Sequence, residues 1–265
     1  MAAKTIAYLT DAHLGQRIIF EKDTHSQTMR YDNNSKENKD HLTFILEDIA
    51  KNGINELVFG GDIGTKEMNQ WFFDVVNSFD INLLMVLGNH DTYAEVSKYY
   101  RHNHTNELYY TLEDDYFKYL YLDSSSNSVS KSQFNWLKQE LSSTKKLVIF
   151  IHHPILEIKT PLDSIGAALN GRAEIRDVLL GLEKEIIIFC GHYHMTDELT
   201  VGNIRQYSSP ACSYQIEKES DVIEIDSSVF GYRLIRIDGN ALSTDVKLFT
   251  RNNLTENPVG SAQNN

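Results

Sequence analysis

Residues 186–194 read Ile-Ile-Ile-Phe-Cys-Gly-His-Tyr-His, an unbroken apolar run that ends on a glycine and two histidines. Such a run, without proline and bounded by glycine, is typical of a strand that is buried on both faces of a sheet. His192 and His194 then lie just beyond the carboxyl end of that strand. Similar stretches occur elsewhere along the chain, and this recurrence predicts an α/β fold.

Five apolar runs end in side chains that can bind a metal. The expected strands are Thr5–Leu9, Glu56–Phe59, Leu83–Leu87, Leu147–Ile151 and Ile186–Cys190. The polar side chains that follow them are, in order, Asp11 and His13, Asp62, Asn89, His152, and the pair His192 and His194. Because sites in open α/β sheets lie beyond the carboxyl ends of the strands, a twisted sheet would gather these side chains at one rim.

The donor set indicates transition metals. Imidazole and carboxylate together suit Mn, Fe, Zn, Co or Ni, whereas Ca and Mg prefer oxygen ligands. Seven ligands are too many for one ion and suit two. Two ions about 3.5–4 Å apart share a ligand, for which a carboxylate is the natural bridge. Asp62, alone at its strand end, is the expected bridging ligand.

Taken singly, each of these residues has an ordinary explanation. A lone aspartate after a strand is more often a turn or helix cap, and an isolated histidine is more often structural. The ordered set favours a site. Its blocks are Asp11-Ala12-His13, Gly60-Gly61-Asp62, Gly88-Asn89-His90-Asp91, His152-His153 and Gly191-His192-Tyr193-His194.

These blocks resemble, without a substitution, the pattern of the calcineurin-like metallophosphoesterase superfamily, and the resemblance covers roughly Ile6 to Phe249. It implies a four-layer αββα sandwich of two mixed sheets flanked by helices. It also implies that Asp11, His13, Asp62 and His194 hold one ion, while Asp62, Asn89, His152 and His192 hold the second.

Further segments are similar to the class III cyclic-nucleotide phosphodiesterases, a branch that includes bacterial cyclic AMP phosphodiesterase and glycerophosphodiesterase. They are Leu122-Asp123-Ser124, Gln133–Leu137, His152-His153-Pro154, Pro210–Gln215 and Gly231-Tyr232-Arg233. The branch implies 3′,5′-cyclic nucleotides as the first substrate, with glycerophosphodiesters or other small phosphoesters as the alternative. It also implies substrate contacts at Asp163 and Asn170, and a homodimer as one candidate assembly.

The mechanism can be argued from the same residues. Two cations lower the pKa of a water that bridges them and polarise a phosphoryl oxygen, so a bridging hydroxide is the expected nucleophile. His90 resembles the family's non-ligand histidine, which either binds a phosphoryl oxygen or protonates the departing alkoxide. Asp91 is expected to fix the tautomer of the His90 imidazole. Polar surroundings favour a solvated face for His25, His41, His102 and His104, and His153 should point away from the ligands.

Composition restricts the partners. The net charge of −12 argues against a surface for long nucleic acids, which need clustered lysine and arginine. A small anionic phosphodiester can still bind, because two divalent ions outweigh two carboxylates. No apolar run approaches the ~20 residues of a membrane span, no leader segment precedes Thr5, and two cysteines fit a reducing compartment. The cytoplasm is therefore the expected location. A scaffold without chemistry is the other class of function, but it would not need the full set of ligands.

Periodicity outlines the rest. Helices are expected at Glu37–Lys51, Glu67–Ser78, Ser130–Leu141 and Arg172–Leu182, and strands at Leu108–Thr111 and Phe117–Leu122. Alternating strands at Ile204–Tyr207, Val222–Ile225, Tyr232–Ile237 and Ser243–Leu248 are expected to complete a second sheet. Long connections, Gly15–Lys39 and Pro154–Gly171, leave from the site, and the first is expected to be a lid or specificity element. Residues 1–250 form one predicted domain, followed by a disordered tail at 251–265.

Overall fold

Two large mixed sheets form the centre of the protein. The computed structural model describes residues 3–19, 28–31, 36–100 and 106–256. The first sheet has the order β15-β14-β1-β4-β5, with β1 at Lys4–Leu9, β4 at Glu56–Phe59, β5 at Asn82–Met85, β14 at Val229–Asp238 and β15 at Ala241–Thr250. The second has the order β10-β11-β9-β8-β7-β6, with β6 at Tyr110–Glu113, β7 at Phe117–Leu122, β8 at Lys146–Ile151, β9 at Ile186–Cys190, β10 at Asp197–Val201 and β11 at Ile204–Ser208.

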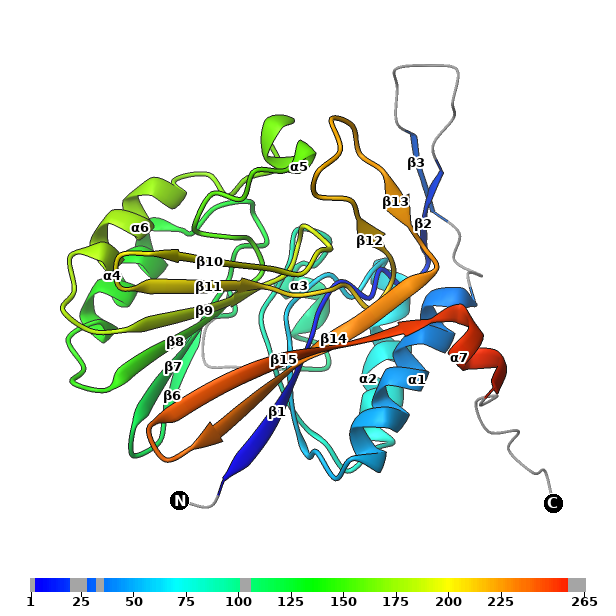
Figure 1. The fold of residues 1–265 in the computed structure, drawn as a ribbon, viewed down its shortest axis with the longest axis horizontal. Helices are drawn as coiled ribbons and strands as arrows, with labels where there is room; N and C mark the ends of the chain where they lie inside the picture. The colour runs from blue at the N-terminus through cyan, green and yellow to red at the C-terminus, as the bar shows by residue number, and fades with distance from the viewer. Residues whose placement is uncertain (1–2, 20–27, 32–35, 101–105, 257–265) are drawn as a thin grey trace.

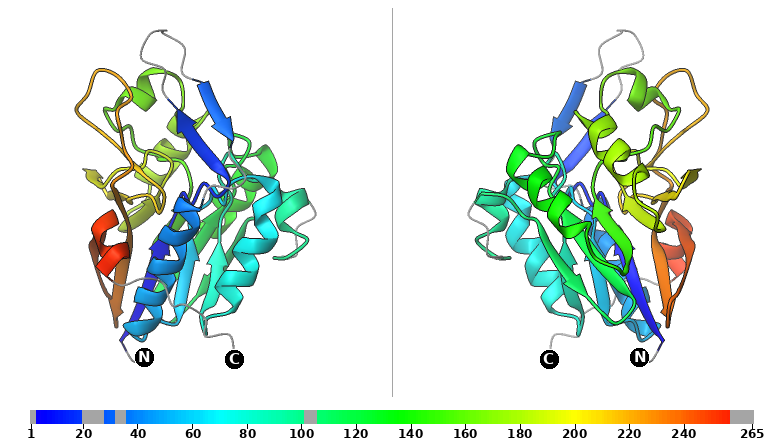
Figure 2. Two further views of the ribbon diagram at one scale, coloured as in Figure 1. Left: turned by 90° about the vertical axis from the view of Figure 1, so that its right-hand side faces the viewer. Right: turned by 90° about the vertical axis from the view of Figure 1, so that its left-hand side faces the viewer.

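Helices cover the outer faces of both sheets. The helices of the described residues are α1 at Glu37–Lys51, the 3₁₀ helix η1 at Lys66–Met68, α2 at Asn69–Asn77, α3 at Tyr93–Val96, α4 at Lys131–Glu140, α5 at Pro161–Ser164, α6 at Arg172–Leu180 and α7 at Arg251–Glu256. Figures 1 and 2 show α1 and α2 against the first sheet, and α4 and α6 against the second. The order helix, sheet, sheet, helix confirms the expected αββα sandwich.

The continuous apolar runs are explained by burial on two sides. In β8, Val148 and Phe150 pack into the core between the sheets, whereas Leu147, Ile149 and Ile151 pack toward the helices. Aromatic rings fill the space between the sheets: Phe150 stacks on Tyr8 with ring centroids 5.7 Å apart, and on Phe189 at 5.5 Å. Because successive side chains of a strand point to opposite faces, a strand between two packed layers must be apolar throughout.

The sequence predicts that the last strands complete the second sheet, but only some of them do. β14 pairs antiparallel with β1, aligning Ile6 with Ile235, and β15 then extends the first sheet. β10 and β11 alone extend the second sheet, and β11 runs parallel to β9. Part of the expected strand at Val222–Ile225 falls in the small pair of β12, at Gln215–Ile216, with β13, at Ile225–Asp226. Alternation reports which face of a strand is buried, but it does not specify a distant partner strand.

The two long connections contain short elements. Gly15–Lys39 includes an antiparallel hairpin of β2, at Gln16–Ile19, with β3, at Thr28–Tyr31. The prediction that this connection acts as a lid or specificity element stays a prediction, and part of the connection lies outside the described ranges. Pro154–Gly171 contains α5. In Figure 1 the β2–β3 hairpin, α5 and the β12–β13 pair all rise on the side of the carboxyl ends of the central strands.

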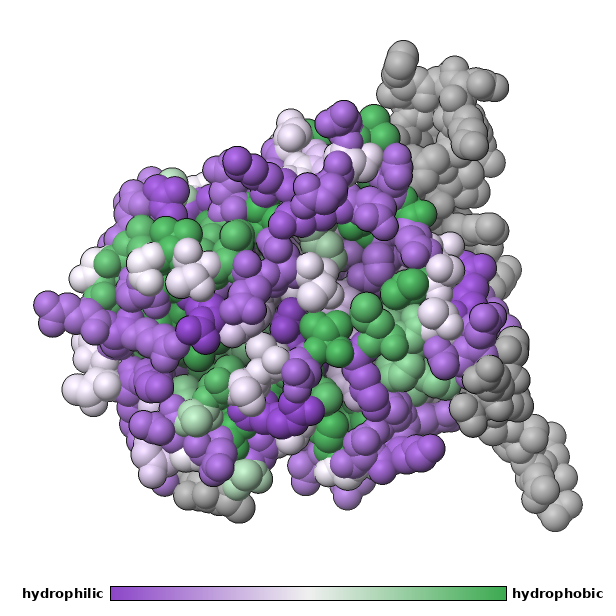
Figure 3. Space-filling model, viewed as in Figure 1, coloured by the Kyte–Doolittle hydropathy of each residue, from purple (hydrophilic) through white to green (hydrophobic). Residues whose placement is uncertain are grey.

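The described part of the tail differs from the predicted disorder. Residues Arg251–Glu256 form α7, Leu254 packs against the core between the sheets, and the Arg251 guanidinium donates to the Ser227 carbonyl. Residues 257–265 lie outside the described ranges. Within those ranges no helix has the length and apolarity needed to cross a membrane. Figure 3 shows one face of the protein, on which hydrophilic residues predominate and hydrophobic residues form smaller patches.

Candidate metal centre

Turns from both sheets bring the predicted ligands together. The strands β1, β4, β5, β8 and β9 end at one rim, and the turn after each carries its predicted ligand or pair of ligands. Asp11 Oδ1 lies 3.2 Å from His194 Nε2, and Asp62 Oδ2 lies 3.2 Å from His152 Nε2. Three overlapping groups of ligand atoms result among the described residues: Asp11 with His13 and His194, Asp62 with His152 and His192, and His13 and Asp62 with His90. The predicted ligands therefore converge as a metal site requires.

The outer nitrogens of the histidines are held by acceptors. His152 Nδ1 donates to the Gly60 carbonyl at 2.8 Å, His194 Nδ1 to the Tyr214 carbonyl at 2.9 Å, and His192 Nε2 to the Ala167 carbonyl at 2.8 Å. A carbonyl can only accept, so each of these nitrogens carries the hydrogen and the other ring nitrogen of a neutral imidazole is bare. This arrangement is typical of histidines that ligate a metal.

The carboxylates show the same division between an outer and an inner atom. Asp11 Oδ2 accepts from Thr10 Oγ1 at 2.7 Å and from the His192 amide at 3.0 Å, while Asp62 Oδ1 accepts from the His90 amide at 2.8 Å. Three atoms at the centre, Asp11 Oδ1, Asn89 Oδ1 and His152 Nε2, are buried without a hydrogen-bond partner among the described residues. Buried polar atoms rarely lack partners, and cations fit this donor set.

Most of the candidate ligands have an unusual backbone conformation. Asp11, His13, Asp62, His192 and His194 have φ of 57°, 44°, 61°, 68° and 51°. Among the described residues, only Asn127 shares a positive φ without being glycine. This region costs an L-residue about 1–2 kcal/mol. Such strain concentrates at functional sites, where the surrounding structure enforces it.

Glycines precede the ligands because neighbouring turns lie too close for a side chain. A Cβ on Gly88 would overlap Asp62 Oδ1, and one on Gly191 would lie 2.5 Å from Asp11 Oδ2. The turn after β5 is thus in contact with the carboxylate of the β4 turn, and the turn after β9 with that of the β1 turn. The glycines of the sequence blocks are explained by this packing between the ligand turns.

The side chains of the centre carry opposed charges. Burial alone would raise the pKa of Asp11 and of Asp62, but the neighbouring histidines outweigh it and hold both pKa values well below the usual range. Burial would lower the pKa of His152, but Asp62 and Asp11 outweigh it and raise this pKa to about 10. Without a cation, His152 would therefore be protonated on both ring nitrogens, and a cation bound at its Nε2 would displace that proton.

His90 lies at the edge of the centre and contacts Gln16. The His90 ring is half-buried, with its centroid 4.9 Å from that of His13, and burial lowers its pKa to about 4. Gln16 Nε2 lies 3.0 Å from His90 Nδ1, and Gln16 Oε1 lies 2.5 Å from His13 Nδ1. Sequence reasoning missed Gln16. The one available signal was a polar residue that follows His13 closely within the first long connection.

The prediction that Asp91 orients His90 is wrong. The Asp91 carboxylate accepts from the backbone amides of Asp62 at 2.7 Å, Ile63 at 3.0 Å and Gly88 at 3.0 Å. Burial and the nearby Asp62 raise the pKa of Asp91 to about 7. The Asp91 side chain points into the protein and connects the turn after β4 with the turn after β5. Asp91 is therefore a structural support of the ligand turns.

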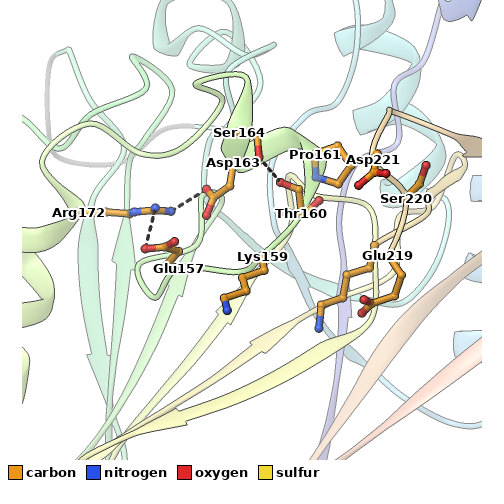
Figure 4. Close-up of a pocket in the computed structure, with 11 residues that line it drawn as sticks. Glu157, Lys159, Thr160, Pro161, Asp163, Ser164, Arg172, Glu219, Ser220 and Asp221 are labelled. Carbon is orange, nitrogen blue, oxygen red and sulfur yellow. Dashed lines mark hydrogen bonds and ion pairs between the residues drawn. The ribbon is translucent and has the colours of Figure 1, made fainter.

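The two predicted substrate contacts, Asp163 and Asn170, lie in different places. Asp163 lines a pocket of about 410 Å³, in which Figure 4 shows it beside Arg172 and Thr160. It accepts from Arg172 Nη1 at 2.8 Å and from the hydroxyl of Tyr193, which stands between two candidate ligands. Asn170 is exposed and lines a separate groove beside α4 and α6. The structure thus connects Asp163 to the ligand turns and places Asn170 elsewhere.

Two other histidines are structural. His41, expected on a solvated face, is buried: its ring stacks on Phe230 at 4.0 Å and its Nδ1 donates to the Ser213 carbonyl at 3.1 Å. That expectation is wrong. Both nitrogens of His153 contact outer groups, Ser124 Oγ at 2.8 Å and Asn127 Oδ1 at 3.0 Å, in agreement with its exclusion from the ligands. His25, His102 and His104 lie outside the described residues.

The fold and the clustered aspartates and histidines define a metallophosphoesterase. A model of the calcineurin-like phosphoesterase family matches residues 4–196, so the chain belongs to this family of metal-dependent hydrolases. The structure resembles a dimetal phosphatase from Danio rerio, with a TM-score of 0.61, 13% identity, and coverage of 93% of this chain and 98% of the other. It also resembles a purple acid phosphatase from yellow lupin, with a TM-score of 0.66, 12% identity, and coverage of 94% and 54%. These likenesses show the fold.

Curated relatives carry names of phosphodiesterases. The chain is 24% identical over 250 residues to a probable cyclic nucleotide phosphodiesterase of Fibrobacter succinogenes, covering 91% of this chain and 92% of the relative. It is 28% identical over 174 residues to a probable glycerophosphodiester phosphodiesterase of Arcobacter nitrofigilis, covering 60% and 64%. The similarity to the Fibrobacter protein extends over nearly the whole chain.

Proposed function

We propose that this protein is a binuclear metal-dependent phosphodiesterase that hydrolyses small phosphodiesters, with 3′,5′-cyclic nucleotides as the first substrate. The observation that carries the proposal is the convergence of carboxylate and imidazole ligand atoms on one centre, where Asp11 Oδ1, Asn89 Oδ1 and His152 Nε2 have no hydrogen-bond partner among the described residues. The name of the Fibrobacter relative supports the cyclic nucleotide. Such an enzyme would take a small anion at the strand ends, while its acidic surface repels long nucleic acids.

Asp62 would be the shared ligand of two ions. Its Oδ2 lies 3.2 Å from His152 Nε2 and 3.6 Å from His13 Nε2, so it faces both halves of the centre. One ion, drawn from Mn, Fe, Zn, Co or Ni, would be held with Asp11, His13 and His194. The other would be held with Asn89, His152 and His192. The mixed nitrogen and oxygen donors suit these metals.

The protein side chains would position the phosphodiester for hydrolysis. When bound, two such cations activate a water molecule and neutralise charge on the phosphoryl group. His90, at the rim of the centre, would contact a phosphoryl oxygen of the substrate. The Gly88 and Gly191 turns keep the ligand carboxylates in place, so that little rearrangement accompanies the reaction.

Hydrolysis of glycerophosphodiesters is the second candidate. The Arcobacter relative supports it by name, although the match covers 60% of this chain. The two substrates share the phosphodiester and differ in the group attached to it. The segments that rise around the centre, the β2–β3 hairpin and α5, are where that difference would be recognised (Figure 1).

Turnover of a substrate panel tests the proposal. With Mn present, we expect cyclic nucleotides to be hydrolysed faster than glycerophosphodiesters, and phosphomonoesters to be hydrolysed slowest. Activity should be lost in Asp62→Ala and His90→Ala, but kept in Asp80→Ala, which removes an exposed carboxylate. Equal rates on monoesters would contradict a diesterase. A metal-free and inert wild-type protein would indicate a scaffold.

A further inference from the structure

Gln16 is held firmly between two histidines of the site. Its side chain is buried, with 5% of the residue exposed. Its backbone amide donates to the His13 carbonyl at 3.0 Å, and the Asn38 side chain donates to the carbonyls of both His13, at 2.8 Å, and Gln16, at 3.4 Å. The position of Gln16 is thus fixed by the turn that carries His13. Its amide group reaches His13 on one side and His90 on the other.

The two ends of an amide have opposite hydrogen-bonding roles: its oxygen accepts and its nitrogen donates. His13 Nε2 faces the centre, 3.0 Å from His194 Nε2 and 3.6 Å from Asp62 Oδ2. If His13 ligates a metal through Nε2, that nitrogen is bare and its Nδ1 carries the hydrogen. Gln16 must then present its oxygen to His13, which is the orientation in the structure. Metal ligation by His13 therefore determines which way the amide points.

The consequence reaches His90. With its oxygen directed at His13, Gln16 directs its NH₂ group at His90 Nδ1, 3.0 Å away. A ring nitrogen that accepts a hydrogen bond carries no hydrogen, so the hydrogen of His90 is on Nε2. An imidazole in this form can donate a hydrogen bond through Nε2. It does not give up this last hydrogen to another oxygen at neutral pH, because the product would be an imidazolate.

We propose that Gln16 is a positioning residue that holds His90 as a neutral imidazole with its hydrogen on Nε2, so that His90 donates a hydrogen bond to a phosphoryl oxygen and transfers no proton to the leaving group. The inference rests on the proposed phosphodiesterase function. In the reaction, water adds to phosphorus and gives up a proton to solvent, and the bond between phosphorus and the leaving oxygen breaks. The leaving oxygen keeps the electron pair and takes its proton from solvent.

The variant Gln16→Glu isolates this role. A glutamate side chain has the same length and can accept from His13 Nδ1, so it preserves the orientation of His13. It cannot donate to His90, and it would instead accept from a hydrogen on His90 Nδ1. Gln16→Met removes both contacts. We expect Gln16→Glu to keep its metal content, and Gln16→Met to bind metal about 10–100-fold more weakly, as is usual when the partner of a ligand is lost.

Nitrogen NMR of the zinc-loaded, diamagnetic protein measures the tautomer directly. In the wild type and in the control Gln139→Glu, which changes an exposed glutamine, the hydrogen of His90 should be on Nε2. In Gln16→Glu a hydrogen should appear on Nδ1. A wild-type His90 with its hydrogen on Nδ1 would overturn the proposal. So would an unchanged His90 spectrum in Gln16→Glu.

Kinetics with different leaving groups test whether His90 transfers a proton to the leaving group. Methyl and p-nitrophenyl phosphodiesters differ strongly in the basicity of the leaving oxygen. If His90 only donates a hydrogen bond, His90→Asn should lower kcat/KM by a similar factor on both, within about threefold. If His90 protonates the leaving group, the methyl ester should lose about 100-fold more, since general acids contribute about 10²–10⁴-fold. That larger loss would overturn the proposal.

The two proposals fail in different ways. Absence of phosphodiesterase turnover in the wild type, with the His90 hydrogen on Nε2, would refute the function and leave the effect of Gln16 on the tautomer standing. Normal turnover with the hydrogen on Nδ1 would refute the role of Gln16 alone.

Discussion

The ligand turns at the strand ends and the connection Pro154–Gly171 both reverse the chain, but they distribute backbone strain differently. In the ligand turns, residues such as Asp62 and His192 take a positive φ, of 61° and 68°, although they are not glycine. In the connection, the residues with positive φ are Gly166 and Gly171, at 86° and 75°, and nothing lies within 4 Å of where their side chains would be.

The difference shows what each region is built for. In the ligand turns, glycine occurs where two turns touch, as at Gly61 with φ of 98°, but most of the ligands take a positive φ although they are not glycine. Three backbone amides, those of Asp62, Ile63 and Gly88, donate hydrogen bonds to the Asp91 carboxylate and hold the turns in this strained conformation. In the connection, glycine relieves strain in open space. The first region should therefore tolerate almost no change, and the second should tolerate many changes.

The largest expected effect contrasts the buried carboxylate of Asp11 with the half-buried carboxylate of Asp163. Asp11→Asn replaces an inward ligand oxygen, and kcat/KM for a phosphodiester should fall by at least about 10³-fold, since a single lost electrostatic group costs about 10²–10³ in rate and the ion is lost as well. Asp163→Asn weakens the contacts with Arg172 and Tyr193 in the connection, and we expect a loss of less than about tenfold. Steady-state kinetics measure both. Equal losses would remove the distinction between the regions.

The next effect is acid destabilisation through His41. Burial lowers the pKa of His41 from 6.5 to about 4, so the unfolded chain takes up a proton before the folded one does. Its contribution to stability is full above pH 6.5 and is lost as the pH falls from 6.5 toward 4, by about 2–3 kcal/mol. Its partner Ser213 donates to the Asp11 carbonyl, so the ligand turns should loosen first.

Hydrogen exchange at pH 7 and pH 4.5 checks this prediction. After correction for the intrinsic exchange rate at each pH, amides around Asp11 and Ser213 should lose protection at the lower pH, whereas those of Pro154–Gly171 should not. His41→Phe, which keeps the stacking on Phe230, should reduce this loss of protection. An equal loss of protection in both regions would count against the role of His41.

The smallest expected difference, about 1–2 kcal/mol in the free energy of unfolding, is between alanine substitutions at two glycines. Gly88→Ala forces a Cβ against Asp62 Oδ1, and we expect it to lower the free energy of unfolding by about 2–4 kcal/mol, from overpacking at a constrained site. A Cβ at Gly166 would meet no atom within 4 Å, so Gly166→Ala should lower the free energy of unfolding by only about 1–2 kcal/mol, the cost of a positive φ. Urea unfolding measures both. A larger loss for Gly166→Ala would reverse the comparison.

Much of this architecture could be predicted from sequence because it depends on local patterns. The run Ile186–Cys190 is apolar throughout since both of its faces are buried, and His192 follows it because the strand ends there. A sheet then aligns such strand ends regardless of their distance along the chain. The bounds of α1 were predicted correctly for a similar reason: an apolar face recurs along Glu37–Lys51.

The remaining features depend on contacts that no local pattern specifies. The pairing of β14 with β1, and the contact of Gln16 with His90, join residues far apart in the chain. His41 is a different case, because it lies on the same helical face as Ile45 and Ile49, and this periodicity indicated burial. The polarity of its imidazole favours a solvated position, but the periodicity of the helix is the better guide to its burial.

The central claim is that Asp62 is shared by two cations at the strand ends. Anomalous diffraction from a crystal grown with ample manganese tests it most directly. We predict two manganese peaks per chain, both in contact with the Asp62 carboxylate, and none at the pocket beside Asp163. A single peak, or peaks that Asp62 does not touch, would contradict the claim.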